Sequence, residues 1–180
     1  MKNNWCSILM IFIALSGVLS CKKERTQTLD CHIENLRVMA INIDSTTVEG
    51  RVVKLINELR KTEGLPPLLV NRAANEVSLK HLRAIHDSTE TLSHDNIDKR
   101  SNEIRHTFPC ANVGENLAWG PRTADLVVSL WYDSPSHRSN ILGDYDFIGV
   151  SVILDANGHY YFSNLFVKGE GTLHIGGIID

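Results

Sequence analysis

The spacing of apolar residues changes along this chain from a helical to a β period, and this change limits the folds that the chain can adopt. In the stretches at 47–63, 71–86 and 123–132, apolar residues recur at steps of three and four, as they do in amphipathic helices. Residues 147–167 instead form two β-rich runs on either side of Asp-Ala-Asn-Gly at 155–158, a strong signal for a hairpin turn. Helices first and a hairpin last predict an α+β domain built in layers.

Capping residues and helix breakers place the ends of the expected helices. Thr46 or Thr47 caps the first helix, and Gly64 with the prolines that follow it stops this helix. Thr123 caps a later helix that Pro135 ends. The pattern predicts helices at residues 47–63, 71–86, 97–104 and 123–132.

The first twenty residues have the features of a signal peptide. Lys2 supplies a short positive region, and the apolar run at 8–19 is too short to span a bilayer comfortably. Val-Leu-Ser-Cys at 18–21 resembles a bacterial lipobox, with Cys21 as the lipidated first residue of the mature protein. The alternative is an uncleaved anchor helix. Both place the domain outside the cytoplasm, and the first makes the protein a membrane-anchored lipoprotein.

The mature chain is expected to hold one domain, because about 160 residues suffice for a single core. We divide it into a lipidated tether at 21–45, a domain at 46–168 and a tail at 169–180. The sequence contains 18 lysines and arginines against 21 aspartates and glutamates, a net charge of −3. This balance gives no electrostatic footprint for nucleic acid. We expect a monomer that contacts the membrane through its N-terminal lipid.

Two cysteines remain once Cys6 of the signal peptide and the lipidated Cys21 are set aside. They are Cys31 and Cys110. In an oxidising compartment they can form a disulfide that fastens the tether to the domain. Two unpaired thiols, one of them buried, are the alternative, since two cysteines carry no spacing signature.

Three short segments carry the groups that could do chemistry. They are Leu-Ser-His at 92–94, Gly-Glu-Asn-Leu-Ala at 114–118 and Trp-Tyr-Asp-Ser-Pro-Ser-His-Arg-Ser-Asn-Ile-Leu at 131–142. Each supplies one group that can hold a metal or move a proton: His94, Glu115 or His137. Two imidazoles and a carboxylate are a credible ligand set for a divalent ion.

The order and context of these segments resemble the CAP superfamily, and especially its bacterial branch. This superfamily comprises cysteine-rich secretory proteins, antigen 5 and pathogenesis-related-1 proteins. Leu-Pro-Pro-Leu at 65–68, Ile-Gly-Val-Ser at 148–151 and Tyr-Tyr-Phe-Ser-Asn-Leu-Phe at 160–166 extend the resemblance. It implies a three-layer α–β–α sandwich around a mainly antiparallel sheet. In that fold, residues 114–118 form a strand that places Glu115 beside the hairpin.

The resemblance also implies a cleft with two histidines and two acidic residues. His94 matches the first histidine, Glu115 the first acid and His137 the second histidine. Ser134 stands where the family usually has its second acid, and Asn116 and Ser134 are expected to line the cleft. The neighbouring Asp133 is a poor substitute, because it points about 100° around the helix.

Two functions are consistent with this set of residues. In the first, a non-catalytic module binds a divalent metal, preferably zinc, through His94 and His137, and recognises a small lipid, peptide or cell-envelope ligand. In the second, a metal-assisted hydrolase uses Glu115 as its general base. The missing second acid favours binding. Glu115 has a further alternative role, as a buried carboxylate that holds the 114–118 segment in place.

Overall fold

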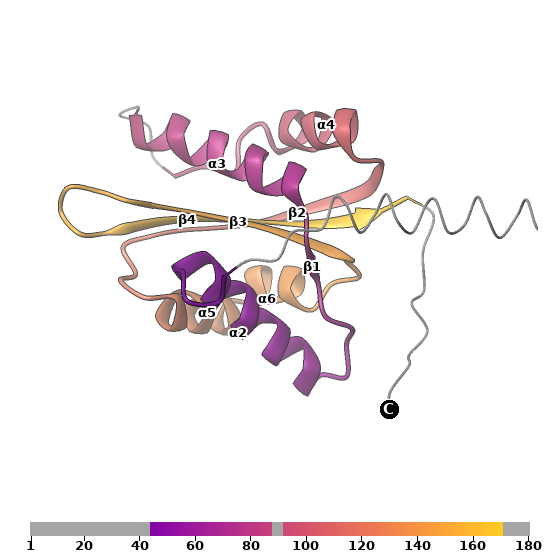
Figure 1. The fold of residues 1–180 in the computed structure, drawn as a ribbon, viewed down its shortest axis with the longest axis horizontal. Helices are drawn as coiled ribbons and strands as arrows, with labels where there is room; N and C mark the ends of the chain where they lie inside the picture. The colour runs from indigo at the N-terminus through magenta and orange to yellow at the C-terminus, as the bar shows by residue number, and fades with distance from the viewer. Residues whose placement is uncertain (1–43, 88–91, 171–180) are drawn as a thin grey trace, which may run out of the picture. The chain divides into compact units, whose positions relative to one another are not determined.

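The computed structural model describes residues 44–87 and 92–170. In this part a four-stranded sheet lies between two layers of helices (Figure 1). The sheet consists of β1 (Leu69–Val70), β2 (Cys110–Trp119), β3 (Phe147–Leu154) and β4 (Tyr160–Gly169). The helices are α2 (Val48–Thr62), α3 (Arg72–Asp87), α4 (Ile97–Thr107), α5 (Ala124–Asp133) and α6 (Pro135–Ile141). The predicted α+β sandwich is therefore confirmed.

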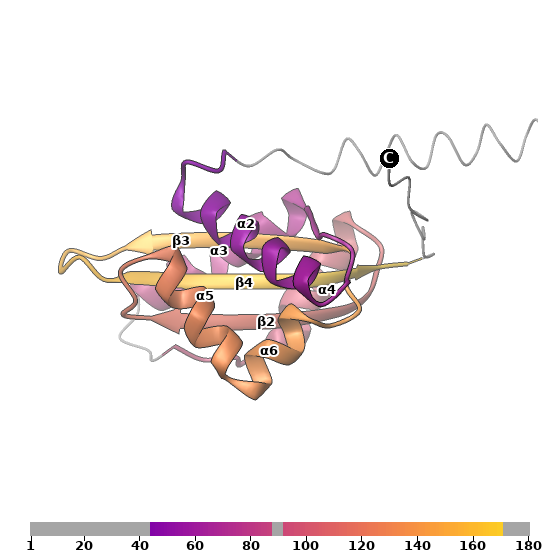
Figure 2. The ribbon, with the colours of Figure 1, turned by 90° about the horizontal axis from the view of Figure 1, so that it is seen from below.

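The two helical layers have different members. Helices α3 and α4 cover one face of the sheet, and α2, α5 and α6 cover the other (Figure 1). Figure 2 shows the second layer in front of the strands, with α5 and α6 over β2 and β4. The main core lies on this side, where Trp131, Phe162 and Phe166 are at most 1% exposed.

The strands run in the order β1-β3-β4-β2, so β2 forms one edge of the sheet. β3 and β4 make the predicted hairpin, and β2 pairs antiparallel with β4. The hairpin turn closes at Gly158, whose φ of 78° favours glycine. β1 pairs parallel with β3 through two residues, so the sheet is mixed although mainly antiparallel.

The helix boundaries follow the capping residues. Thr47 accepts a bond from the Gly50 amide at the start of α2, and Thr123 accepts one from Leu126 at the start of α5. Pro135 does more than end α5, because it also begins the short helix α6. Proline fits the first turn of a helix, where its missing N–H has no partner to lose.

A buried arginine attaches α2 to the end of α6. Arg60 is 1% exposed, and its guanidinium donates to the carbonyls of Pro66, Ile141 and Gly143 at 2.9 Å each. The Ile141 carbonyl ends α6 and the other two carbonyls lie in loops, so one guanidinium joins three separate stretches of backbone. The bonds fix the position of α6, which carries His137.

The N-terminal expectations lie outside the described residues. The signal peptide, Cys21, the tether up to residue 43 and the tail after residue 170 therefore stay predictions, as do the domain boundaries. Cys110 is fully buried and bonds no described cysteine, while Cys31 is not described, so their disulfide also stays a prediction. Within 44–87 and 92–170, no helix combines the length and apolar character needed to cross a membrane.

Candidate functional site

Glu115 is a buried carboxylate on β2. Its side chain is 2% exposed and forms an ion pair with Arg100 of α4, whose Nη2 lies 2.7 Å from Glu115 Oε2. Arg100 is itself 7% exposed. Each charge therefore depends on the other, because an unpaired charge at this depth would be strongly unfavourable.

His94 binds the same carboxylate oxygen from the loop before α4. Its Nδ1 lies 2.9 Å from Glu115 Oε2, and since a carboxylate only accepts, Nδ1 carries the proton. Arg100 holds the backbone of this loop by donating to the carbonyls of Asp95 and His94, at 2.7 and 3.3 Å. The His94 side chain is 57% exposed, so its other nitrogen, Nε2, remains available to solvent.

His81 of α3 supports the pair from behind. Its Nε2 donates to the Ser93 carbonyl at 3.2 Å, which leaves Nδ1 to accept from Arg100 at 3.4 Å. The ring is neutral in this arrangement. Burial and the neighbouring charge of Arg100 lower the pKa of His81, and Glu115 opposes this only in part. Both ring nitrogens of His81 are thus used, one on the loop that carries His94 and one on Arg100.

His137 reaches the site from α6, which is held to β2 by two asparagines. Asn116 Nδ2 donates to the His137 carbonyl at 3.1 Å. Asn140 Nδ2 donates to the Glu115 carbonyl at 3.0 Å and to Asn116 Oδ1 at 2.9 Å. Burial, and secondly the proximity of His94, lower the pKa of His137. Its imidazole therefore stays neutral, and able to ligate, to a lower pH than an ordinary histidine.

Gly114 allows this close approach of α6 to β2. A Cβ at Gly114 would lie 2.7 Å from Asn140 Oδ1 and 2.5 Å from the Tyr145 hydroxyl, which is too near for either neighbour. The glycine of the Gly-Glu-Asn-Leu-Ala segment is thus explained by packing.

The two histidines meet across the free edge of β2. His94 comes from the layer of α3 and α4, and His137 from α6 in the opposite layer (Figure 1). Their ring centroids lie 6.5 Å apart with an interplanar angle of 47°. The structure therefore brings His94, Glu115, His137 and Asn116 together, while their functional roles stay predictions.

Ser134, which was expected to line the cleft, lies between α5 and α6, where its hydroxyl bonds that of Ser136 at 3.2 Å. Among the described residues no hydrogen bond joins it to His94 or His137, and its role in the cleft stays a prediction. Arg100 was not recognised from the sequence. Its spacing from Ile97 and Ile104 puts it on the inner face of α4, and a basic residue on an inward face was the signal available.

The imidazole donors of the site suit a divalent metal ion, but their geometry fits one only in part. Two imidazoles on one tetrahedral zinc ion, at about 2.0–2.1 Å from each nitrogen, have ring centroids about 5 Å apart. His94 and His137 would have to approach by about 1 Å to share an ion. Among the described residues no group of three histidine, cysteine, aspartate or glutamate side chains is arranged to hold a metal. Glu115 Oε2 is already bound to Arg100 and His94.

An α–β–α sandwich with this histidine–glutamate–histidine set at a sheet edge has the features of a CAP domain. Residues 53–167 match the family model described as the cysteine-rich secretory protein family, CAP. This match covers more than half of the chain, and the protein therefore belongs to the CAP family.

Two relatives from Bacillus subtilis (strain 168) share this domain. The uncharacterized protein YkwD is 32% identical over an aligned length of 114 residues, and the match covers 58% of this chain and 42% of YkwD. The uncharacterized membrane protein YlbC is 28% identical over an aligned length of 129 residues, and the match covers 68% of this chain and 35% of YlbC. This chain thus spans less than half the length of either relative.

Solved structures show the same fold. An outer surface protein of Borrelia burgdorferi superposes with a TM-score of 0.62 at 24% identity, covering 73% of this chain and 100% of that protein. An extracellular protein of Bacillus anthracis that contains an SCP domain superposes with a TM-score of 0.55 at 23% identity, covering 67% and 40%. At these identities the likeness establishes the fold alone.

Proposed function

We propose that this protein is an extracytoplasmic CAP-domain lipoprotein that acts as a binding module. His94 and His137 bind a divalent metal ion, with zinc as the first choice. A small lipid, peptide or cell-envelope ligand is recognised at the same edge of β2. A metal ion held there would supply coordination positions for oxygen atoms of that ligand.

The contact between His94 and Glu115 is the observation that carries this proposal. Because Nδ1–H donates to the carboxylate, the lone pair of His94 is on Nε2, the exposed nitrogen. A carboxylate bound to the far nitrogen of a metal-binding histidine fixes its tautomer and raises its basicity as a ligand. Glu115 therefore acts behind His94 and does not itself need to touch the metal.

The position of Glu115 favours binding over hydrolysis. A general base must contact the water that it deprotonates. Glu115 Oε2 already accepts from Arg100 and His94, and Glu115 Oε1 is buried without a hydrogen-bond partner among the described residues. Neither oxygen is available to a water molecule on the solvent side of His94.

Metal analysis of the purified protein tests the proposal. Wild-type protein should bind zinc in an isothermal titration, and His94→Ala with His137→Ala should abolish this binding. Because imidazole must be neutral to ligate, affinity should also fall as acidification protonates the two histidines. The matched control is His86→Ala with His106→Ala, which removes two exposed histidines from α3 and α4. Equal zinc binding by both double variants would refute the metal site.

The location rests on the lipobox-like sequence before Cys21. Among structures that share the fold, one is an outer surface protein and one an extracellular protein, in keeping with a position outside the cytoplasm. Cys21→Ser should release the protein from the membrane fraction, as followed by fractionation and mass spectrometry of the N-terminus. A variant that stays in the membrane and retains residues 1–20 would contradict lipid anchoring.

A further inference from the structure

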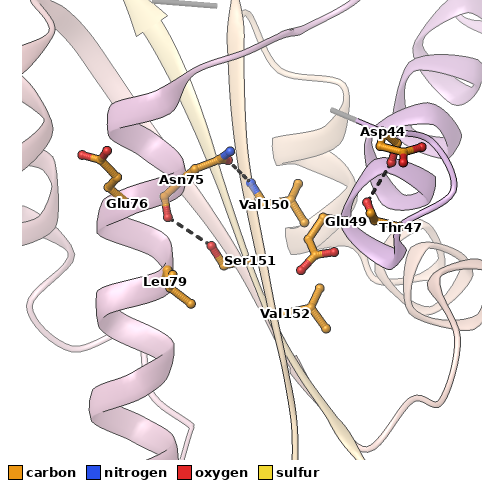
Figure 3. A pocket seen from close by; sticks show the side chains of 9 residues that line it. All are labelled: Asp44, Thr47, Glu49, Asn75, Glu76, Leu79, Val150, Ser151 and Val152. Carbon is orange, nitrogen blue, oxygen red and sulfur yellow. Dashed lines mark hydrogen bonds between the residues drawn. The ribbon is translucent and has the colours of Figure 1, made fainter. Parts of the chain in front are cut away.

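A hollow of about 400 Å³ lies along β3, near the edge of the sheet that is opposite to the β2 edge and its histidine site. Figure 3 shows it between two helices, with α3 on one side and the start of α2 on the other. The β3 residues Val150, Ser151 and Val152 form its floor. The hollow is therefore a groove that has the edge of a β-strand at its bottom.

The edge of β3 in this groove is open because β1 is short. β1 pairs only with Phe147 and Ile148, and the chain then enters α3 at Arg72. No other described strand pairs with β3 on this side. Residues 149–154 thus have a neighbouring strand, β4, on one side only.

The hairpin ladder determines which backbone groups point into the groove. The Asp155 amide donates to the His159 carbonyl, so the odd-numbered residues of β3 bond to β4. The even-numbered residues face outward, as the Val150 amide does in donating to Asn75 Oδ1 at 2.8 Å. Val152 is next in this series and presents both its N–H and its C=O at the open edge.

The groove combines apolar side chains near the strand edge with acidic side chains along its sides. Leu79 of α3 and the two valines of β3 provide apolar contacts in the groove. Three carboxylates line its sides: Asp44, Glu49 and Glu76. Glu76 also binds Arg72 at 2.8 Å, with both side chains exposed. None of the described residues that line the groove is basic.

We infer that this groove binds an extended, positively charged peptide segment, which adds to the sheet as a strand beside β3. Backbone bonds to Val152 give such a segment its register, as in other complexes formed by strand addition. Its successive side chains alternate between the α2 side and the α3 side. Each side of the groove offers an apolar contact and a carboxylate. A peptide segment in which lysine or arginine lies next to β-branched residues therefore matches both sides of the groove.

Charge also decides between a peptide and a second copy of this chain. Two copies that paired edge to edge would bring together two sets of the same three carboxylates. Like charges placed opposite each other are unfavourable in a sheet and at an interface. A cationic strand meets the same carboxylates with attraction and is therefore the better occupant.

Fluorescence anisotropy with the full-length protein and a labelled peptide, Lys-Thr-Val-Lys-Val-Thr-Lys, tests this inference. The peptide should bind, and the same peptide with glutamate in place of lysine should not. Val152→Pro removes the outward N–H and leaves the bonds of the odd-numbered residues to β4 in place. It should weaken peptide binding at least about tenfold, which corresponds to a loss of about 1.4 kcal/mol of binding free energy.

A charge-reversal variant covers the case in which the proline variant does not fold. Glu49→Lys with Glu76→Lys should weaken binding at least about tenfold. Glu58→Lys, which reverses an exposed charge on α2 away from the groove, should leave binding unchanged. The inference is overturned if wild-type protein does not bind the lysine peptide, or if Glu58→Lys weakens binding as much as the groove variant. Self-association of wild-type protein that Val152→Pro abolishes would likewise overturn it, by showing a second copy at the edge.

Discussion

Glu115 joins two parts of the site that are distant in the sequence. Its Oε2 accepts from the guanidinium of α4 and from the imidazole of the preceding loop, at 2.7 and 2.9 Å. The carboxylate is therefore both a structural group and the partner that orients His94. The two roles left open by the sequence are compatible, because one oxygen atom serves both.

We predict that Glu115→Ala costs about 3–5 kcal/mol of unfolding free energy, because it leaves Arg100 buried without a counter-charge. Urea unfolding measures the loss. Asp125→Ala breaks the pair between Asp125 and Arg51, whose side chains are 60% and 41% exposed, and should cost far less, because solvent screens an exposed ion pair. Equal small losses in both variants would show that the buried pair does not stabilise the domain.

The lowered pKa of His81 predicts acid sensitivity. Burial and Arg100 depress this pKa in the folded state, so the unfolded chain binds the proton more readily. The stabilisation is therefore complete above the unfolded pKa of about 6.5 and is lost as the pH falls below it. Unfolding free energies at pH 7 and pH 5 should differ less in His81→Gln than in wild-type protein. His86→Gln, at an exposed position on the same helix, is the matched control.

At the scale of elements, α6 and β2 form one unit. The outward carbonyls of Glu115 and Leu117 on β2 accept bonds from Asn140 and from Trp131 Nε1, at 3.0 and 3.2 Å. These bonds satisfy backbone groups that a sheet edge would otherwise leave open. The Asn140 bond also holds α6, which carries His137, beside the strand that carries Glu115, while the Trp131 bond attaches α5 to the same strand.

We predict that Asn140→Ala weakens zinc binding although Asn140 is not a ligand. The variant loses the two bonds that hold α6 to β2, and the unfolding free energy should fall by about 1–3 kcal/mol. Ser139→Ala on the same helix removes only an exposed bond to the Ser136 carbonyl and should change neither property. Isothermal titration and urea unfolding measure the two effects. Unchanged zinc affinity in Asn140→Ala would mean that α6 does not position His137.

Local signals were sufficient to predict α2 to α5 and the β3–β4 hairpin, whereas part of β2 followed only from the family resemblance, and β1 and α6 were not predicted. Thr47 and Thr123 cap their helices as expected, since capping depends on neighbouring residues alone. β1 was not predicted, because its two residues have no period. It forms where Asn57 holds the Leu68 backbone, with bonds of 2.8 and 3.0 Å. α6 was missed because a proline that stops one helix can also begin another.

The convergence of His94 and His137 could not be derived from periodicity. The two residues lie in opposite helical layers, and only the resemblance to the CAP family placed them together. Arg100 was missed for a related reason, since its partner Glu115 is on another element and a sequence does not show which inward charge has a partner.

At the scale of the whole molecule, we predict that residues 46–168 fold without the N-terminal segment. The buried apolar residues of the described core all lie within this range, from Val52 to Val167. Thermal unfolding followed by circular dichroism should show one cooperative transition, as expected of a small single domain. A broad, non-cooperative transition would mean that residues outside this range are needed.

The two edges of the sheet differ in a way that limits how copies of this protein could assemble. On β2 the outward carbonyls of Glu115 and Leu117 are engaged by Asn140 and Trp131, whereas no described strand pairs with residues 149–154 of β3 on their outer side. A sheet with two open edges can add neighbours on both sides and grow into a ribbon. A sheet with one open edge stops after a single addition. Because two outward carbonyls of β2 are already engaged, this domain is better suited to end a growing sheet at β3 than to extend one through β2.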